Sequence, residues 1–235
     1  MFREQFQGLT YLLSHPLQLK RLIIRETRYR QRQQNKRKWM EWQKYNNSTT
    51  TGHSTATAYS RPLNVVRIQT ISDMVNRIGN GLSVLDVGCG NGDISDIISK
   101  MGNHVMSVDL PPMTILAHKR RVSSVVTGDA EQLAFVSNSL DIVLASEVVE
   151  HLWNPDNFFH EAHRVLKTNG YLIVETPEGK ESLRYDSHRH FFTVECLEQM
   201  LDASFSVREV KRLEPTLGAP TPTIIVLLRR IHDQD

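Results

Sequence analysis

The sequence predicts an α/β protein with a doubly wound, mostly parallel sheet, and three observations support this prediction. From residue 62 onward, short apolar runs alternate with segments of helical spacing, a pattern typical of a parallel sheet with helices on both faces. The first apolar run ends in the glycine-rich stretch LDVGCGNGD, where a doubly wound sheet has its nucleotide site. The last two apolar runs follow one another across the loop EPTLGAPTP, which predicts an antiparallel edge.

The expected helices show the spacing and the start and stop residues of helices. Pro62 is permitted in a first helical turn, and Gly79 and Gly102 are suitable stops. A second proline start precedes MTILAHKRR. The expected helices cover residues 62–78, 91–102, 111–121, the stretch from 146 to about 167, and 193–204.

The expected strands are apolar runs bounded by Gly, Pro or short polar turns. The fourth run is preceded by the turn-like SNS. The expected strands cover residues 82–88, 104–110, 122–130, 140–145, 169–177, 205–213 and 223–230.

Residues 1–60 differ from the rest in charge and are predicted to form an extension of the domain at 61–235. They carry 11 Lys and Arg against 3 Asp and Glu, whereas the remaining residues carry 17 against 23. Apolar residues in 20–45 are too sparse for a good amphipathic stripe, so we expect a solvated helical arm that packs on the domain or on a second subunit of a homodimer. The alternative is a basic arm that contacts nucleic acid, membrane headgroups or an acidic partner. The uncharged, Ser/Thr-rich residues 46–60 are predicted to form a lid or linker.

Composition narrows the class of protein. The two cysteines, Cys89 and Cys196, do not suggest a disulfide framework. No apolar run approaches the roughly 20 residues that span a bilayer, and the N-terminus lacks the apolar centre of a signal peptide. A cytoplasmic protein is the plain expectation. An organelle transit peptide stays open, because the first 40 residues are rich in Arg and poor in acids.

Acidic residues at the ends of three successive strands predict a nucleotide-like cofactor. Asp86 lies in LDVGCGNGD, whose glycines allow a sharp turn and a close approach of ligand to backbone. Asp109 ends the second expected strand, where a carboxylate accepts hydrogen bonds from ribose hydroxyls. Asp129, at the end of the third, is placed to accept from an adenine amino group. A role as helix cap or turn residue explains any one of these acids but not easily all three.

In combination, LDVGCGNGD, VDL, GDAEQLAF and LKTNGYLIVETP resemble the motifs of the class I S-adenosylmethionine-dependent methyltransferases, over roughly residues 62–230. The resemblance implies a Rossmann-like sheet of seven strands with the last strand antiparallel. It also implies a set of cofactor residues. These are Asp86 near the methionine amino group, Gly88 and Gly90 along the methionine and ribose, Asp109 and Leu110 at the ribose, Asp129 and Ala130 at the adenine, and Ser146 at the floor of the site.

The stretch SEVVEHLW, after the fourth expected strand, carries the candidate acceptor chemistry. In a helix, Glu147, Glu150 and His151 would share one face. The order E-x-x-E-H, with a later DSHRHFFT, resembles the ubiquinone-pathway O-methyltransferases and, more weakly, the small-RNA 2′-O-methyltransferases. The latter resemblance implies a Mg²⁺ or Mn²⁺ site at Glu147, Glu150, His151 and His188. We prefer His188 to His190 by its distance from the following Phe-Phe-Thr.

Several alternatives remain open from the sequence. Acids at a helix start are also favoured by the positive end of the helix dipole. In a metal-free reading, His151 is the general base and Glu150 its helper. We expect S-adenosylmethionine-dependent O-methylation of a small-molecule or sugar hydroxyl. The alternatives are methylation of an RNA ribose, with residues 20–45 as the RNA contact, and a non-catalytic binding module of the same fold.

Overall fold

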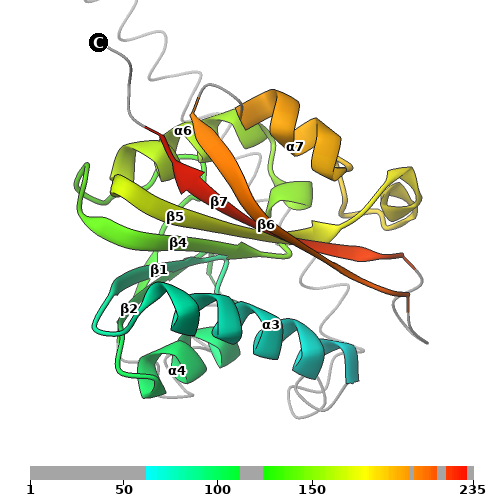
Figure 1. Ribbon diagram of the computed structural model, residues 1–235. Coiled ribbons are helices and arrows are strands. Elements are labelled where there is room, and N and C mark those ends of the chain that lie inside the picture. The colour runs from blue at the N-terminus through cyan, green and yellow to red at the C-terminus, as the bar shows by residue number, and fades with distance from the viewer. Residues whose placement is uncertain (1–61, 112–123, 202–203, 216–220, 232–235) are drawn as a thin grey trace, which may run out of the picture. The chain divides into compact units, whose positions relative to one another are not determined.

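The protein is described by a computed structural model that covers residues 62–111, 124–201, 204–215 and 221–231. The basic arm, the Ser/Thr-rich segment and the helix expected at 111–121 therefore lie outside the described residues, apart from residue 111. Over the described ranges, seven strands form one sheet in the order β3-β2-β1-β4-β5-β7-β6 (Figure 1). The strands are β1 (Ser83–Val87), β2 (His104–Asp109), β3 (Val125–Thr127), β4 (Leu140–Ser146), β5 (Leu166–Pro177), β6 (Phe205–Leu213) and β7 (Thr223–Arg230).

The pairing of the strands confirms the predicted topology. β1 pairs in parallel with β2 and β4, and the parallel pairing continues to β3 on one side and β5 on the other. β7 pairs antiparallel with both β5 and β6, as the final apolar runs predicted. The strand order reverses between β1 and β4, so the carboxyl ends of these two strands form the topological switch point at which such sheets bind ligands.

Helices cover both faces of the sheet (Figure 1). α3 and α4 contribute to an apolar core that includes Ile71, Met74 and Ile98, whereas α6 and α7 contribute Phe158 and Leu197 to a second core. In the described part of the chain, the helices are α3 (Pro62–Ile78), α4 (Asp93–Lys100), α6 (Pro155–Val165) and α7 (Val194–Leu201), with 3₁₀ helices η1 (Val149–His151) and η2 (Lys180–Arg184).

The central strands read as continuous apolar runs because both of their faces are buried. In β4, Ile142 and Leu144 belong to the core beneath α3 and α4, while Val143 and Ala145 belong to the core beneath α6 and α7. This alternation follows from the period of two along a strand. Of the strand expected at 122–130, the structure describes residues 124–130, and among these the strand β3 covers only Val125–Thr127.

The largest difference from the expected elements follows β4. The predicted helix from 146 to about 167 is wrong in its first half, because α6 begins only at Pro155. Asn154 caps α6, its side chain accepting a hydrogen bond from the Asp156 amide at 3.2 Å. Pro155 occupies the first helical position, where its missing N–H costs nothing. The residues between β4 and α6 form only the single 3₁₀ turn η1, and this changes the candidate site.

Candidate active site

The glycine loop after β1 adopts a conformation that requires glycine. Gly88, Gly90 and Gly92 have φ angles of 71°, 55° and 81°. A Cβ atom on Gly88 would lie 2.3 Å from Cγ2 of Val148, so the loop also passes close to the segment after β4. The loop therefore passes close to the switch point, and the lack of a Cβ atom at Gly88 is what permits this approach.

Asp109 ties the glycine loop to the end of β2. Its Oδ2 accepts a hydrogen bond from the Gly90 amide at 2.7 Å, and its Oδ1 accepts one from the Leu110 amide at 2.6 Å. Burial raises the pKa of Asp109 to about 6, although these two amides favour the ionised form. The predicted ribose-binding carboxylate thus lies beside the loop that is predicted to carry the methionine part of the cofactor.

Asp129 lies at the next position along the same edge of the sheet. The Gly128 amide donates to the Asp109 carbonyl at 3.0 Å, so the ends of β2 and β3 are joined directly. Asp129 Oδ1 accepts from the Glu131 amide at 2.9 Å. Asp129 and Ala130 are both half-buried. The structure thus brings the predicted ribose and adenine residues together on neighbouring strand ends.

Asp86 has a different environment from the one that the resemblance implies. Its carboxyl group is 2% exposed and accepts a hydrogen bond from the Ser95 hydroxyl at 2.5 Å. Ser95 in turn lies 2.7 Å from the hydroxyl of Ser107, so the three residues connect α4, β1 and β2. Burial raises the pKa of Asp86 to about 7. Asp86 therefore has a structural part in the core, and its contact with a methionine amino group stays a prediction.

Ser146, at the end of β4, belongs to a buried charged cluster. The Ser146 hydroxyl and Arg67 Nη2 both donate to Glu175 Oε2, each at 2.6 Å. Arg67 Nη2 also lies 3.5 Å from Glu147 Oε1. Burial raises the pKa of Glu175 to about 8, against the attraction of Arg67. This cluster connects α3 to the ends of β4 and β5.

Arg67 and Glu175 are not among the site residues predicted from the sequence. Glu175 lies in the apolar run LIVETP, and an acid inside a strand that is otherwise apolar on both faces is a signal that a partner exists. Arg67 carries no such signal, because its position on α3 resembles that of any other half-buried charged residue on a helix. Only the tertiary fold brings these two residues together.

Glu147 does not share a helical face with Glu150 and His151, so this prediction is wrong. Its φ angle is 55°, which is incompatible with an α-helix. The Glu147 amide donates to the Glu175 carbonyl at 2.9 Å, which extends the β4–β5 pairing by one residue. The chain turns only after this bond, and the Glu147 carboxylate faces Arg67 instead of the histidines.

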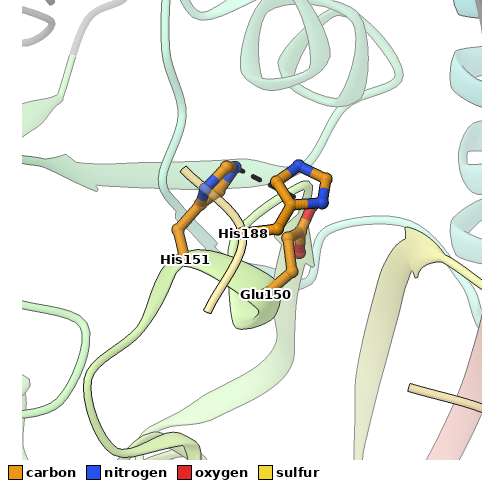
Figure 2. A group of neighbouring side chains, drawn as sticks. All are labelled: Glu150, His151 and His188. Atoms are coloured by element: carbon orange, nitrogen blue, oxygen red, sulfur yellow. Dashed lines mark ion pairs between the residues drawn. The ribbon is translucent and has the colours of Figure 1, made fainter. Parts of the chain in front are cut away.

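Glu150, His151 and His188 do come together, as predicted for three of the four candidate metal ligands (Figure 2). One ligand atom from each lies within 4.8 Å of the others. The two imidazole rings meet edge to face with centroids 4.8 Å apart. Amides of Arg189 and His190 donate to the Glu150 carbonyl at 2.7 and 3.2 Å, which holds the loop carrying His188 against η1. His190 itself lies next to Phe192 and is outside the group.

The hydrogen bonds of this group orient its lone pairs. His151 Nδ1 lies 3.0 Å from the Ser187 carbonyl, which only accepts, so Nδ1 carries the proton in the neutral ring. Glu150 Oε2 accepts from the Thr176 hydroxyl at 3.0 Å. Among the described residues, Glu150 Oε1 and His188 Nδ1 are buried without a hydrogen-bond partner. Two buried polar atoms without a hydrogen-bond partner beside His151 fit a divalent cation, and the Glu150 oxygen also fits a proton donor.

The pKa shifts of all three residues favour their neutral forms, mainly because the side chains are buried. The pKa of Glu150 rises to about 8, and the pKa of His188 falls to about 4, with His151 as a second cause. The pKa of His151 is also lowered. A neutral imidazole is the form that accepts a proton or binds a metal ion.

Glu175 and Thr176 place the two groups of side chains on opposite faces of β5. Thr176 donates to Glu150 of the histidine group, whereas its neighbour Glu175 bonds to Arg67 and Ser146. Consecutive residues of a strand point to opposite faces of the sheet. The end of β5 therefore takes part in both groups.

A family of known proteins matches the central part of the chain, which includes the glycine loop, the ends of β2, β3 and β4, and η1. Residues 85–174 match the family model described as "Methyltransferase domain". A ubiquinone biosynthesis O-methyltransferase of Azorhizobium caulinodans is 32% identical over 130 residues, which cover 48% of this chain and 51% of that protein. A probable S-adenosylmethionine-dependent methyltransferase of Mycolicibacterium smegmatis is 31% identical over 147 residues, which cover 59% and 55%. The chain thus spans about half the length of the curated relatives it matches.

Solved structures share the fold at low sequence identity. The N-methyltransferase NodS of Bradyrhizobium japonicum, in complex with S-adenosyl-L-homocysteine, has a TM-score of 0.64 at 16% identity over 73% of this chain and 89% of that one. A 1,6-didemethyltoxoflavin-N1-methyltransferase of Burkholderia thailandensis has a TM-score of 0.65 at 18% identity over 81% and 87%. These likenesses confirm the predicted fold class.

Proposed function

We propose that the chain, whose residues 85–174 match the family model described as "Methyltransferase domain", transfers the methyl group of S-adenosylmethionine to a hydroxyl of a small molecule or sugar. The observation that carries the proposal is the group Glu150, His151 and His188, which follows β4 at the switch point. The glycine loop lies beside the same segment, because Gly88 faces Val148. A cofactor on the loop would therefore lie next to groups that accept protons.

The proposed cofactor site runs along the ends of β1, β2 and β3. Gly88 and Gly90 would lie along the methionine and ribose, and Ser146 at the floor. Asp109 would accept hydrogen bonds from the ribose hydroxyls beside Leu110. Asp129 would accept from the adenine amino group over Ala130. The joined ends of β2 and β3 support this assignment, since ribose and adenine are adjacent in the ligand.

In the metal-free form of the proposal, which is the rival of a bound cation, His151 is the general base. The neutral ring donates from Nδ1 to the Ser187 carbonyl, so Nε2 has the lone pair that takes the acceptor's proton. Glu150 Oε1 lies 3.9 Å from Nε2 and stabilises the imidazolium that results. Methyl transfer itself requires that the acceptor oxygen be aligned about 3 Å from the sulfonium methyl. The position of both proposed sites near the carboxyl ends of the parallel strands supports such an alignment.

A divalent cation at the same group remains part of the proposal, with Glu147 removed from the ligand set. Glu150 Oε1, His151 and His188 would hold the ion, and the orphaned atoms of Glu150 and His188 fit such a role. When bound, the ion would lower the pKa of the acceptor hydroxyl. Two imidazoles and one carboxylate suit Mn²⁺ better than Mg²⁺, because Mg²⁺ prefers oxygen ligands.

The test is a radiolabelled methyl-transfer screen with the full chain. Catechols, sugars and RNA serve as acceptor pools, each assayed in EDTA and with added Mn²⁺ or Mg²⁺. We expect transfer to a hydroxylated small molecule, loss of activity in EDTA, and recovery with Mn²⁺. Full turnover in EDTA would leave His151 as a metal-free base, and no transfer to any pool with no cofactor binding would contradict the proposal.

The names of the relatives favour a small-molecule hydroxyl over RNA. Several curated relatives are ubiquinone biosynthesis O-methyltransferases. The RNA alternative depends on residues 20–45, which lie outside the described residues, and it stays a prediction. The non-catalytic alternative stays a prediction as well, and the same screen tests it.

A further inference from the structure

The loop from Gly128 to Ser139 joins β3 to β4 and begins with the proposed adenine residues. Its regular pairing among the described residues is a single bridge between Asp129 and Gln132. A loop of this kind loses conformational entropy when it is ordered, and its backbone groups need partners. The position of Asp129 therefore depends on whatever holds the rest of the loop.

Two side chains of α6 hold the middle of this loop. Glu161 Oε2 accepts a hydrogen bond from the Leu133 amide at 2.7 Å. Arg164 Nη2 donates to the Leu133 carbonyl at 2.9 Å, and Arg164 Nη1 donates to the Phe135 carbonyl at 2.8 Å. Glu161 and Arg164 also bond to each other, with Nε to Oε1 at 2.7 Å. The pair thus binds three backbone groups of the loop at once.

The residue types match this task. A guanidinium group presents several N–H donors in one rigid plane, so Arg164 reaches two carbonyls and a carboxylate together. Arg164 lowers the pKa of Glu161, which keeps the carboxylate ionised as an acceptor. The two side chains are 36% and 21% exposed. An ion pair at such exposure stabilises a fold only slightly, so the main effect of the pair is the geometry that it imposes on the loop.

The start of the loop is tied to the segment after η1, on the proposed acceptor side of the site. Glu131 Oε1 accepts a hydrogen bond from the Trp153 amide at 2.8 Å. Trp153 follows η1, which carries His151. Asp129 Oδ1 accepts from the Glu131 amide, so the proposed adenine acceptor sits between this contact and β3.

From these contacts we infer that Glu161 and Arg164 of α6 are positioning residues for the adenine half of the cofactor site. They fix the loop in the conformation that presents Asp129, without touching the cofactor themselves. This inference rests on the proposed cofactor. It adds that α6, a helix on the face of the sheet, sets the affinity for the adenosine part of the ligand.

The test compares two substitutions of Arg164 with a matched control. Arg164→Met removes all contacts of the guanidinium, whereas Arg164→Lys keeps the charge next to Glu161 but cannot bond both carbonyls. The control is Lys167→Met, which breaks the ion pair of Lys167 with both oxygens of Asp141, at 2.9 Å each. That pair lies at the amino ends of β4 and β5, away from the site.

Calorimetric titration with S-adenosyl-L-homocysteine measures the outcome. We expect the dissociation constant to rise by about tenfold in both Arg164 variants and to stay unchanged in the control. In turnover assays, the KM for S-adenosylmethionine should rise while kcat at saturating cofactor stays at the wild-type level. A general loss of folded protein would instead lower kcat.

Two results would overturn the inference. One is a wild-type dissociation constant in both Arg164 variants. The other is an equal rise in Lys167→Met, which would assign the effect to stability. Should Arg164→Met fail to fold, Arg164→Lys decides alone. A wild-type protein that binds no S-adenosyl-L-homocysteine would contradict the proposed function itself, so the two failures are distinguishable.

Discussion

Asp86 shows how a single residue can match a cofactor motif and yet be buried in the core. Its carboxyl group accepts from Ser95 and lies behind the glycine loop, where burial raises its pKa to about 7. An ionised carboxylate at that depth has a desolvation penalty that a neutral amide does not have. The residue therefore offers a test of its structural part that is independent of any ligand.

Replacing Asp86 by Asn should alter the pH dependence of stability. The folded state holds the Asp86 proton up to about pH 7, whereas the unfolded chain releases it near its ordinary value of 3.8. Folding therefore takes up a proton in this window, and the free energy of unfolding of the wild type falls as the pH rises, by up to about 4 kcal/mol. The free energy of unfolding of Asp86→Asn should not show this decrease with pH.

Denaturant titrations at about pH 5 and about pH 8 measure the effect. The two proteins should be similar in stability at the lower pH, and Asp86→Asn should be the more stable at the higher pH. A difference that does not change with pH would show that the carboxyl is ionised in the folded state at both values.

His151 and His190 form a matched pair for testing the proposed base. His151→Ala should lower kcat by roughly 10²- to 10⁴-fold, the usual range for loss of a general base, while cofactor affinity stays unchanged. His190→Ala should retain activity, because His190 lies next to Phe192 and outside the group. Steady-state kinetics with the acceptor from the screen give both values. A fully active His151→Ala variant would assign the stretch after β4 to structure alone.

At the level of elements, the strands could be predicted from the sequence and the segment after β4 could not. β1, β4 and β7 are buried on both faces, so their apolar runs mark them with little ambiguity. In contrast, the positive φ of Glu147 results from its amide bonding to the Glu175 carbonyl, a contact between residues 28 positions apart. No local pattern encodes such a bond.

The residues of the candidate site also fall into those that the sequence predicts and those that depend on tertiary packing. Asp109, Asp129 and the glycine loop follow directly from strand ends, and the structure places them together. Glu150, His151 and His188 also meet, although not through the helical face that the spacing suggested. Arg67 and the Glu161–Arg164 pair depend on how helices pack on the sheet, which one sequence alone does not reveal.

The start of α6 provides a prediction at this scale. Asn154→Ala removes the side-chain oxygen that caps the helix and should lower the free energy of unfolding by about 1 kcal/mol. Asn154→Asp retains an acceptor and should stay close to the wild type. Chemical denaturation of the three proteins tests the cap. Equal stability of all three would mean that Pro155 alone fixes the start of the helix.

At the level of the whole molecule, the described residues form one sheet with a core on each face. None of the helices in this part of the chain is long and apolar enough to cross a bilayer. The predicted cytoplasmic location, the homodimer and the role of residues 1–60 stay predictions. The proposed cofactor residues lie at or just after the carboxyl ends of β1 to β4, so ligand binding there should stabilise the domain as a unit.

Thermal unfolding with S-adenosyl-L-homocysteine tests this coupling. At a ligand concentration of about 100 times Kd, binding to the folded state adds about 2.7 kcal/mol, which should raise the Tm by roughly 5–10 °C. Asp109→Ala should show a much smaller rise at the same ligand concentration, because it loses the ribose acceptor. A larger rise with NAD than with S-adenosyl-L-homocysteine would contradict the proposed cofactor.

At the end of β5, the neighbouring residues Glu175 and Thr176 contact two separate groups of polar side chains, one on each face of the sheet. On one face, Glu175 forms an ion pair with Arg67. On the other face, Thr176 contributes a hydroxyl that donates a hydrogen bond to Glu150 of the histidine group. Because the pleat alternates strictly, deleting one residue of β5 before Glu175 would turn the Glu175 side chain to the face of the histidine group and the Thr176 side chain to the face of Arg67. Point substitutions in the histidine group leave the Arg67–Glu175 ion pair on the opposite face unchanged. Side chains on the face of the histidine group can therefore change without loss of the ion pair that connects α3 to β5 on the other face.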